Sequence, residues 1–211
     1  MKNHHKHNID LEVDSEGTAF LIFNKGFSLF AISKPNYWKY QDNSELISYS
    51  CVGGKLEEGE SAIEAGKRES YEELGIDVRI HSSKVTYLID FQLNKQLIEF
   101  NQSIKPFAIY YTKFSEKPGE NSENWSLSGR VYVYFASLLG DPYPSSEIPA
   151  LLWLKWEDML FNISNPMRFN EILSKGLIIE KVEIPNNSYF IPVMTPEIIG
   201  KVFGKITGNL K

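Results

Sequence analysis

The chain has 211 residues, of which 42% are hydrophobic and 23% are charged, so one globular domain with an extension is expected, and a disordered or fibrous chain is excluded. Its 22 Lys and Arg against 27 Asp and Glu give a net charge of −5, which argues against nucleic acid as a partner. A single cysteine (Cys51), an N-terminus without an apolar signal stretch and the lack of a long apolar run predict a cytoplasmic protein that neither forms an internal disulfide nor enters a membrane.

The N-terminal part of the chain is predicted to contain strands followed by one helix. Residues 1–15 are polar and are expected to form a flexible tail. Apolar runs bounded by turn residues predict strands, and an acid-flanked stretch that ends at Gly75 predicts a helix. The expected elements are a hairpin of two strands at 18–23 and 27–32, a strand at 46–52, and a helix at 61–74.

The rest of the chain is predicted to be mostly strands, with further helices near its end. Strands are expected at 78–80, 85–93, 97–100, 107–114, 131–138 and 150–156, the last of which runs into a short helix. The C-terminal elements are expected to be a helix at 166–174, a hairpin of strands at 177–184 and 189–193, and a helix at 196–203. Strands, one helix and then more strands indicate an α+β fold with a mixed β-sheet.

Three glutamates gather on one face of the helix expected at 61–74. At 100° per residue, Glu69, Glu72 and Glu73 fall within an arc of roughly 100°, with neighbouring side chains about 5–6 Å apart, so they are expected to converge. Like charges at this spacing repel one another, and a positive ion over the cluster would stabilise it. Oxygen ligands alone favour Mg²⁺ or Mn²⁺. The ordinary alternative for a row of acids is a solvated helix face.

The residues around these glutamates follow a fixed spacing. The residues at the fixed positions are Gly54, Glu60, Arg68, Glu69, Glu72, Glu73, Gly75 and Ile76. At these positions the sequence resembles the signature of the Nudix hydrolase family, and a solvated helix face explains neither the glycines nor Arg68. Only Ser70 departs, since it stands where an apolar residue is usual. Together with Gly66, Ser70 predicts a looser contact between helix and sheet, with the serine hydroxyl bonding back to a helix carbonyl.

The resemblance implies a fold, an activity and a set of site residues. The fold would be the α/β/α sandwich of the family, and the activity would be that of a pyrophosphohydrolase in which water attacks a phosphorus of a nucleoside diphosphate linked to another moiety. Glu69 and Glu73 would be the principal ligands of Mg²⁺ or Mn²⁺, with Glu72 beside them. The Gly53 carbonyl is a further candidate ligand, and Arg68 would orient the carboxylates during catalysis.

Two parts of the chemistry stay open at the level of sequence. The general base is either a glutamate of the signature or one on a later loop, where Glu116, Glu120 and Glu123 lie. No additional motif identifies which small-molecule nucleotide derivative is the substrate.

The organisation of the chain leaves further alternatives. Residues 16–160 are expected to be the hydrolase domain, whereas residues 161–211 resemble no known family. This C-terminal α/β extension is expected to pack either on the core of its own subunit or at a homodimer interface. A second functional hypothesis is a catalytically weak module that senses a nucleotide for a partner, although an intact set of acids speaks against it.

Overall fold

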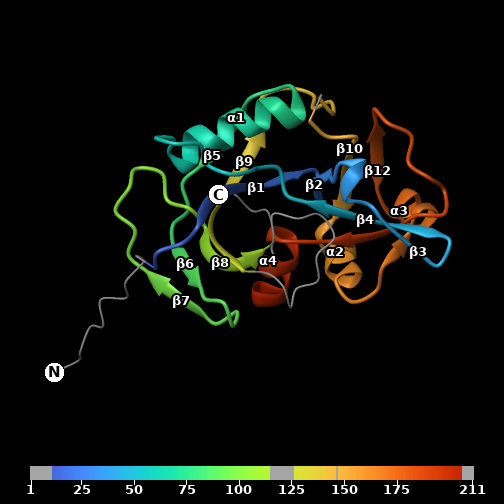
Figure 1. Cartoon of the computed structure of the whole chain (residues 1–211). Coiled ribbons are helices and arrows are strands. Elements are labelled where there is room, and N and C mark those ends of the chain that lie inside the picture. The colour runs from blue at the N-terminus through green and yellow to red at the C-terminus, as the bar shows by residue number, and fades with distance from the viewer. Residues whose placement is uncertain (1–10, 115–125, 146, 206–211) are drawn as a thin grey trace.

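The computed structural model describes residues 11–114, 126–145 and 147–205, and it places a mixed β-sheet between layers of helices (Figure 1). The strands are β1 (Ser15–Asn24), β2 (Phe27–Ile32), β3 (Lys39–Gln41), β4 (Ser44–Ser50), β5 (Val78–His81), β6 (Thr86–Ile89), β7 (Lys95–Ile98), β8 (Ala108–Phe114), β9 (Leu127–Leu138), β10 (Ala150–Lys155), β11 (Met167–Arg168), β12 (Leu177–Glu180) and β13 (Tyr189–Pro192). The helices are η1 (Pro35–Tyr37), α1 (Ala62–Leu74), α2 (Trp156–Asn162), α3 (Phe169–Lys175) and α4 (Thr195–Phe203). The predicted α+β class and the α/β/α sandwich are confirmed.

The strand order places β1 near the centre of the sheet. Along the hydrogen-bonded path the order is β11, β13, β4, β2, β1, β9, β8, β6 and β7. Four strands lie off this path: β10 pairs with β2 and with β12, β3 pairs with β4, and β5 pairs with β9. The β1–β9 and β4–β13 pairs are parallel, so the sheet is mixed as expected.

Strand β1 explains why the sheet needs helices on both faces. Its apolar side chains alternate between two cores, with Ala19 and Leu21 in one and Phe20 and Ile22 in the other. The core around Phe20 lies under α1, and the core around Ala19 lies under α2, α3 and α4 (Figure 1). The unbroken apolar run of β1 is therefore typical of a strand that is buried on both faces.

Among the strands whose length differs from the prediction, two differ for a clear local reason. The strand expected at 85–93 ends at Ile89, because the Asp90 carboxylate accepts the N–H groups of Gln92 and Asn94, both at 2.9 Å. These bonds form the turn into β7. Strand β9 begins at Leu127, before the predicted 131, because its first residues already pair with β8 and β1.

Helix α1 begins one residue later than predicted, ends at the predicted residue and has strong end signals. Ser61 and Glu64 form a capping box at its start, and Gly75 ends it in the left-handed region with φ of 69°. The buried Ser70 hydroxyl donates to the Lys67 carbonyl at 2.9 Å, as expected. The looser helix–sheet contact predicted from Gly66 is wrong, because an added Cβ at Gly66 would lie 2.2 Å from the Phe20 ring. The glycine lets the ring pack directly against the helix backbone.

The C-terminal segment packs on the sheet, and one predicted pairing within it is wrong. The strands expected to form a hairpin at 177–193 pair elsewhere: β12 is antiparallel to β10, while β13 is parallel to β4 and antiparallel to β11. The turn between β12 and β13 therefore connects two different parts of the sheet. Helix α3 begins later than predicted, because Met167 and Arg168 first pair with β13.

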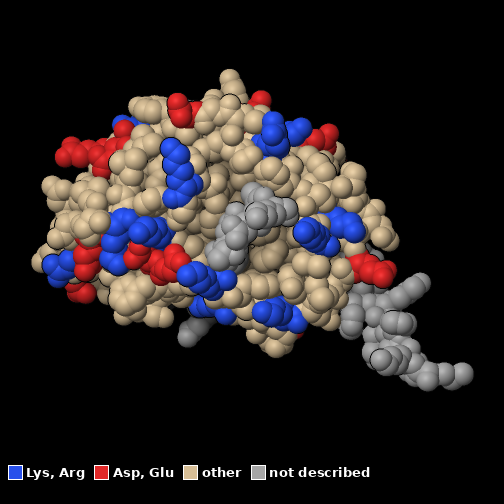
Figure 2. All heavy atoms as spheres, turned by 180° about the vertical axis from the view of Figure 1, so that it is seen from behind, with Lys and Arg blue, Asp and Glu red and all other residues tan. Residues whose placement is uncertain are grey.

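The surface gives two further observations. None of the helices in the described part of the chain combines the length and apolar character that a membrane crossing requires. On the face shown in Figure 2, Lys and Arg side chains are spread out and interspersed with Asp and Glu. Among the described residues, this face therefore shows no continuous basic track for a phosphate backbone.

Candidate active site

Arg68 ties helix α1 to the loop that precedes it. Its guanidinium donates from Nε to Glu60 Oε1 and from Nη2 to Glu60 Oε2, both at 3.0 Å. Its Nη1 donates to Glu69 Oε1 and Glu72 Oε2, both at 2.9 Å, and its Nη2 donates to the Lys55 carbonyl at 2.9 Å. The Arg68 contact also lowers the pKa of Glu60. A planar guanidinium with five N–H donors can hold this many oxygens at once, which fixes the helix and the loop as one unit.

Glu73 lies on the same helix but has a different partner. Its Oε2 accepts the main-chain N–H of Gly53 at 3.0 Å. Burial raises the pKa of Glu73 to about 8; the hydrogen bond from Gly53 offsets part of this rise, and the nearby Glu69 carboxylate adds to it. A nearby cation would therefore stabilise the ionised form of the Glu73 carboxyl group.

Two glycines allow the loop to lie directly against β1 and α1. Gly53 has φ of 142°, and an added Cβ there would lie 2.1 Å from the Thr18 carbonyl oxygen. At Gly54 an added Cβ would lie 2.1 Å from Glu69 Oε1. Burial also raises the pKa of Glu69, even though Arg68 opposes that rise. The carboxyl groups of Glu69 and Glu73 therefore lie against consecutive residues of one loop.

The residues predicted for the site lie together, but the three carboxylates do not converge on one point. Glu69 and Glu72 both bond Arg68, whereas Glu73 turns to the main chain of Gly53. Within residues 11–114, 126–145 and 147–205, no group of three or more Asp, Glu, His or Cys side chains is arranged to hold a metal ion. Arg68 binds two of the three carboxylates. The convergence of all three on one cation, expected from helix geometry, therefore stays a prediction.

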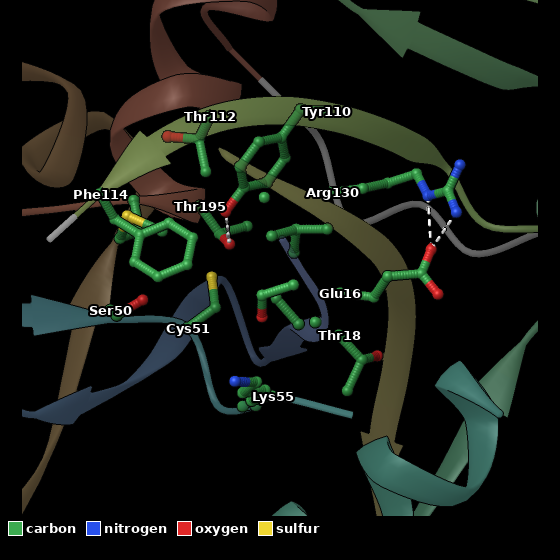
Figure 3. Close-up of a pocket in the computed structure, with 18 residues that line it drawn as sticks. Glu16, Thr18, Ser50, Cys51, Lys55, Tyr110, Thr112, Phe114, Arg130 and Thr195 are labelled. Atoms are coloured by element: carbon green, nitrogen blue, oxygen red, sulfur yellow. Dashed lines mark hydrogen bonds and ion pairs between the residues drawn. The ribbon is translucent and has the colours of Figure 1, made fainter. Parts of the chain in front are cut away.

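A cavity of about 290 Å³, here called the sheet cavity, opens beside the same loop (Figure 3). Its walls come from β1, β8, β9, the loop after β4 and the start of α4. Cys51, Tyr110 and Phe114 belong to the sheet face opposite α1, and Lys55 lies at the loop side of the cavity. Because Gly53 also lines it, the sheet cavity and the Glu73 carboxyl share a loop residue.

One ion pair belongs to the wall of the sheet cavity and not to its interior. Arg130 Nε donates to Glu16 Oε1 at 2.5 Å, and Figure 3 shows this pair pointing away from Cys51 and Phe114. Both side chains lie on the opposite face of β1 and β9 from Ala19 and Val131, as alternation along a strand requires. The pair joins β1 to β9 beside the loop.

Sequence reasoning missed several residues of the sheet cavity. Tyr110 and Thr195 lie 85 residues apart and are joined by a buried hydrogen bond of 2.9 Å. Tyr110 could have been found only as a polar group in a predicted buried strand, and nothing in the sequence signals that Thr195 meets it. Lys55 lies inside the signature but carried no predicted role. The loop candidates for the general base, which are Glu116, Glu120 and Glu123, lie outside the described residues.

Cys51 has the environment expected of a buried filler. Its side chain is buried, and burial raises the pKa of the thiol, with the Glu73 charge adding to the rise. The thiol therefore stays protonated and is a poor nucleophile.

Comparison with known proteins finds similarity over most of the chain, including the residues of this site. A family model described as the NUDIX domain matches residues 17–171, which is most of the chain. Similar solved structures include a NUDIX hydrolase from Nitrosomonas europaea, with 18% identity, a TM-score of 0.44, and coverage of 69% of this chain and 74% of that chain.

Two further structures have related descriptions. An ADP-ribose pyrophosphatase from Streptococcus suis has 18% identity and a TM-score of 0.40, and the match covers 68% of this chain and 75% of that chain. The dihydroneopterin triphosphate pyrophosphohydrolase of E. coli has 14% identity and a TM-score of 0.43, with coverage of 69% of this chain and 84% of that chain. No curated protein matched the chain significantly.

Proposed function

Because the chain belongs to the Nudix family and is a Nudix-type hydrolase, we propose that it cleaves a nucleoside diphosphate linked to another moiety, by attack of water on a phosphorus of the diphosphate. The observation that carries the proposal is the shared loop. Gly53 lines the sheet cavity and bonds Glu73, while Gly54 lies against Glu69. A nucleotide derivative held in the sheet cavity would therefore present its diphosphate beside these two carboxyl groups.

The chemistry of the donors fits Mg²⁺ or Mn²⁺. Glu73 and Glu69 are partly buried carboxyl groups with raised pKa values, so a positive charge beside them would stabilise their ionised forms. We propose Glu69 and Glu73 as the principal ligands, with Glu72 and the Gly53 carbonyl as further donors. A bound divalent ion would polarise a phosphoryl oxygen, offset the charge of the diphosphate and lower the pKa of the attacking water.

The remaining residues of the site would bind and orient. Arg68 holds Glu69 and Glu72 by hydrogen bonds of 2.9 Å, so it would fix the carboxylates while the substrate binds. Lys55 lines the sheet cavity, and its ammonium group has no ion-pair partner in the described part of the chain. A lysine that lines the cavity and belongs to the same loop as Gly53 and Gly54 would bind phosphate oxygens of the substrate.

The C-terminal extension would complete the substrate site. The start of α4 lines the sheet cavity through Met194 and Thr195. We therefore propose that residues 16–160 are the hydrolase domain and that residues 161–211 pack on it to close the cavity. Since β12 and β13 already cover β10 and β4 of the same chain, this role is preferred to packing at a homodimer interface. A cytoplasmic location is proposed from the sequence.

A panel of nucleoside diphosphate derivatives tests the proposed function. The purified protein is incubated with Mg²⁺ or Mn²⁺ in heavy-oxygen water, and the phosphorus that receives the label is identified. We expect metal-dependent cleavage of at least one compound and a loss of about 100-fold or more in turnover for Glu73→Gln. Glu64→Gln is the matched control, because Glu64 lies on the same helix but its carboxylate bonds only Ser61 among the described residues. Cleavage unaffected by chelation, or equal in both variants, would contradict the proposal.

A second candidate function is a nucleotide-sensing module. The observation that favours it is that Glu69 and Glu72 are already held by Arg68. In the same panel, tight binding of a nucleotide without any metal-dependent release of products would support the sensor and reject the hydrolase.

A further inference from the structure

Two buried hydroxyl groups lie at one end of the sheet cavity. They have two protons but, among the residues described, form one hydrogen bond, which joins them to each other. Tyr110 Oη and Thr195 Oγ1 are 2.9 Å apart, and both residues are buried, with 1% and 2% of their surface exposed. Figure 3 shows this pair at the cavity, joined by a dashed line. Burial raises the pKa of Tyr110, so its hydroxyl keeps its proton. Two protons are present, and only one can lie in the bond between the two oxygens.

The second proton has no acceptor in the described part of the chain, because neither hydroxyl has another partner there. An unsatisfied donor that faces a cavity binds best to an occupant that supplies an acceptor. The pair therefore prefers an acceptor on the ligand, whichever of the two oxygens donates within the pair.

The same residue offers a second donor. Thr195 begins α4, and Met194 before it makes no side-chain capping bond. The main-chain N–H of Thr195 has no partner among the residues described, and N–H groups of a first turn point out of the helix end. An oxo oxygen has two lone pairs and can accept from both the N–H and the hydroxyl, whereas an amino group can accept from neither without losing its conjugation.

We infer that Thr195, positioned by Tyr110, is a specificity residue that selects a nucleobase with an oxo group over one with an amino group at this end of the sheet cavity. The inference rests on the proposed function, because it assumes that the sheet cavity takes the nucleoside part of the substrate.

Equilibrium binding of four nucleoside monophosphates tests the inference without hydrolysis or metal. Inosine monophosphate and adenosine monophosphate form one oxo and amino pair, and uridine monophosphate and cytidine monophosphate form the other. We expect the wild-type protein to bind the oxo member of at least one pair about 10-fold or more tightly. Thr195→Val and Tyr110→Phe should each remove most of that preference, and Thr195→Ser should restore it.

Tyr49→Phe is the matched control. Tyr49 also has a buried hydroxyl, but it accepts from Asn162 at 2.9 Å and does not line the sheet cavity. Its loss should lower stability and leave the preference unchanged. Equal binding of oxo and amino nucleotides by the wild type, retention of the preference in Thr195→Val, or no binding of any of the four would overturn the inference. If the preference is found but no diphosphate compound is cleaved, only the proposed hydrolysis fails.

Discussion

Arg68 is the residue on which the arrangement of the signature acids depends. It bonds Glu60, Glu69 and Glu72 and also the Lys55 carbonyl. Lysine keeps the charge but cannot present the planar fork that reaches all of these oxygens. We expect Arg68→Lys to lower kcat about 10- to 100-fold with a smaller effect on KM, because misplaced carboxylates impair the reaction more than substrate binding. Steady-state kinetics measure this, and an unchanged kcat would show that Arg68 has only a structural role.

Glu73 should make the stability of the metal-free protein depend on pH. Its pKa is raised from 4.5 to about 8, so the folded protein keeps a proton that the unfolded chain releases within that window. Stability due to Glu73 is therefore greatest at low pH and is lost as pH rises toward 8. Between pH 5 and 9 we expect a loss of about 2–4 kcal/mol in wild type that Glu73→Gln lacks.

Urea unfolding in the presence of a chelator measures this difference at each pH. The comparison between the two proteins isolates Glu73, because the other titrating groups are common to both. Parallel profiles for wild type and Glu73→Gln would contradict the assignment of a buried, proton-retaining carboxyl at this position.

The residues of the site could be predicted from sequence only as far as local geometry decides them. Helix spacing correctly places Glu69, Glu72 and Glu73 on one side of α1 together with Arg68. Spacing could not decide which carboxylate bonds Arg68 and which bonds Gly53. That choice depends on how closely the loop approaches the helix, and this approach is set by the pairing of Gly54 and Val52 with β1.

At the scale of elements, substitutions at two glycines should have different effects on catalysis and on stability. The three atoms nearest to an added Cβ at Gly54 would all belong to the carboxyl end of the flexible Glu69 side chain. We expect Gly54→Ala to displace Glu69, lowering kcat about 10-fold or more while changing the free energy of unfolding by less than about 1 kcal/mol. Kinetics and thermal unfolding of the same sample measure both quantities. A normal kcat would show that Glu69 does not need this close loop.

Gly66 lies on the buried face of the same helix and should behave in the opposite way. An added Cβ there would lie 2.2 Å from the Phe20 ring, inside a packed core. Alanine would favour the helix by about 1 kcal/mol, but overpacking costs about 1–3 kcal/mol, so Gly66→Ala should lower stability overall. Calorimetry measures the change, and a rise in Tm would mean that the contact between α1 and β1 adapts easily.

Element boundaries were predictable where a local signal exists. Ser61, Glu64 and Gly75 mark the ends of α1, and the bounds of this helix follow from them. The hairpin expected at 177–193 failed because turn residues reveal a change of direction but not the partner of each strand. The partners of β12 and β13 come from distant parts of the chain, namely β10 and β4.

At the scale of the whole molecule, the C-terminal extension should be required for folding. Strands β12 and β13 pair with β10 and β4, and Phe190 and Ile199 are fully buried in the core under α2 to α4. A chain that ends at Lys175 would expose these edges and leave that core open. We expect it to lose cooperative thermal unfolding, as followed by circular dichroism. A soluble truncated protein with an unchanged Tm would contradict this account.

The fold class and the family signature could be predicted from the sequence, because alternating burial and helix spacing are local patterns. The sheet cavity was not, since it joins Gly53, Tyr110 and Thr195 from three distant segments. Only the packing of the complete sheet brings these residues together.

The central claim is that Glu69 and Glu73, backed by Gly53 and Gly54, hold a divalent cation beside the sheet cavity. Anomalous scattering from a crystal soaked with Mn²⁺ and a non-hydrolysable diphosphate analogue tests it most directly. The account predicts the strongest Mn²⁺ peak within bonding distance of the Glu69 and Glu73 carboxyl oxygens, and its loss in Glu73→Gln crystals. A strongest peak elsewhere on the molecule, or no peak at these carboxyl groups with the analogue bound, would contradict it.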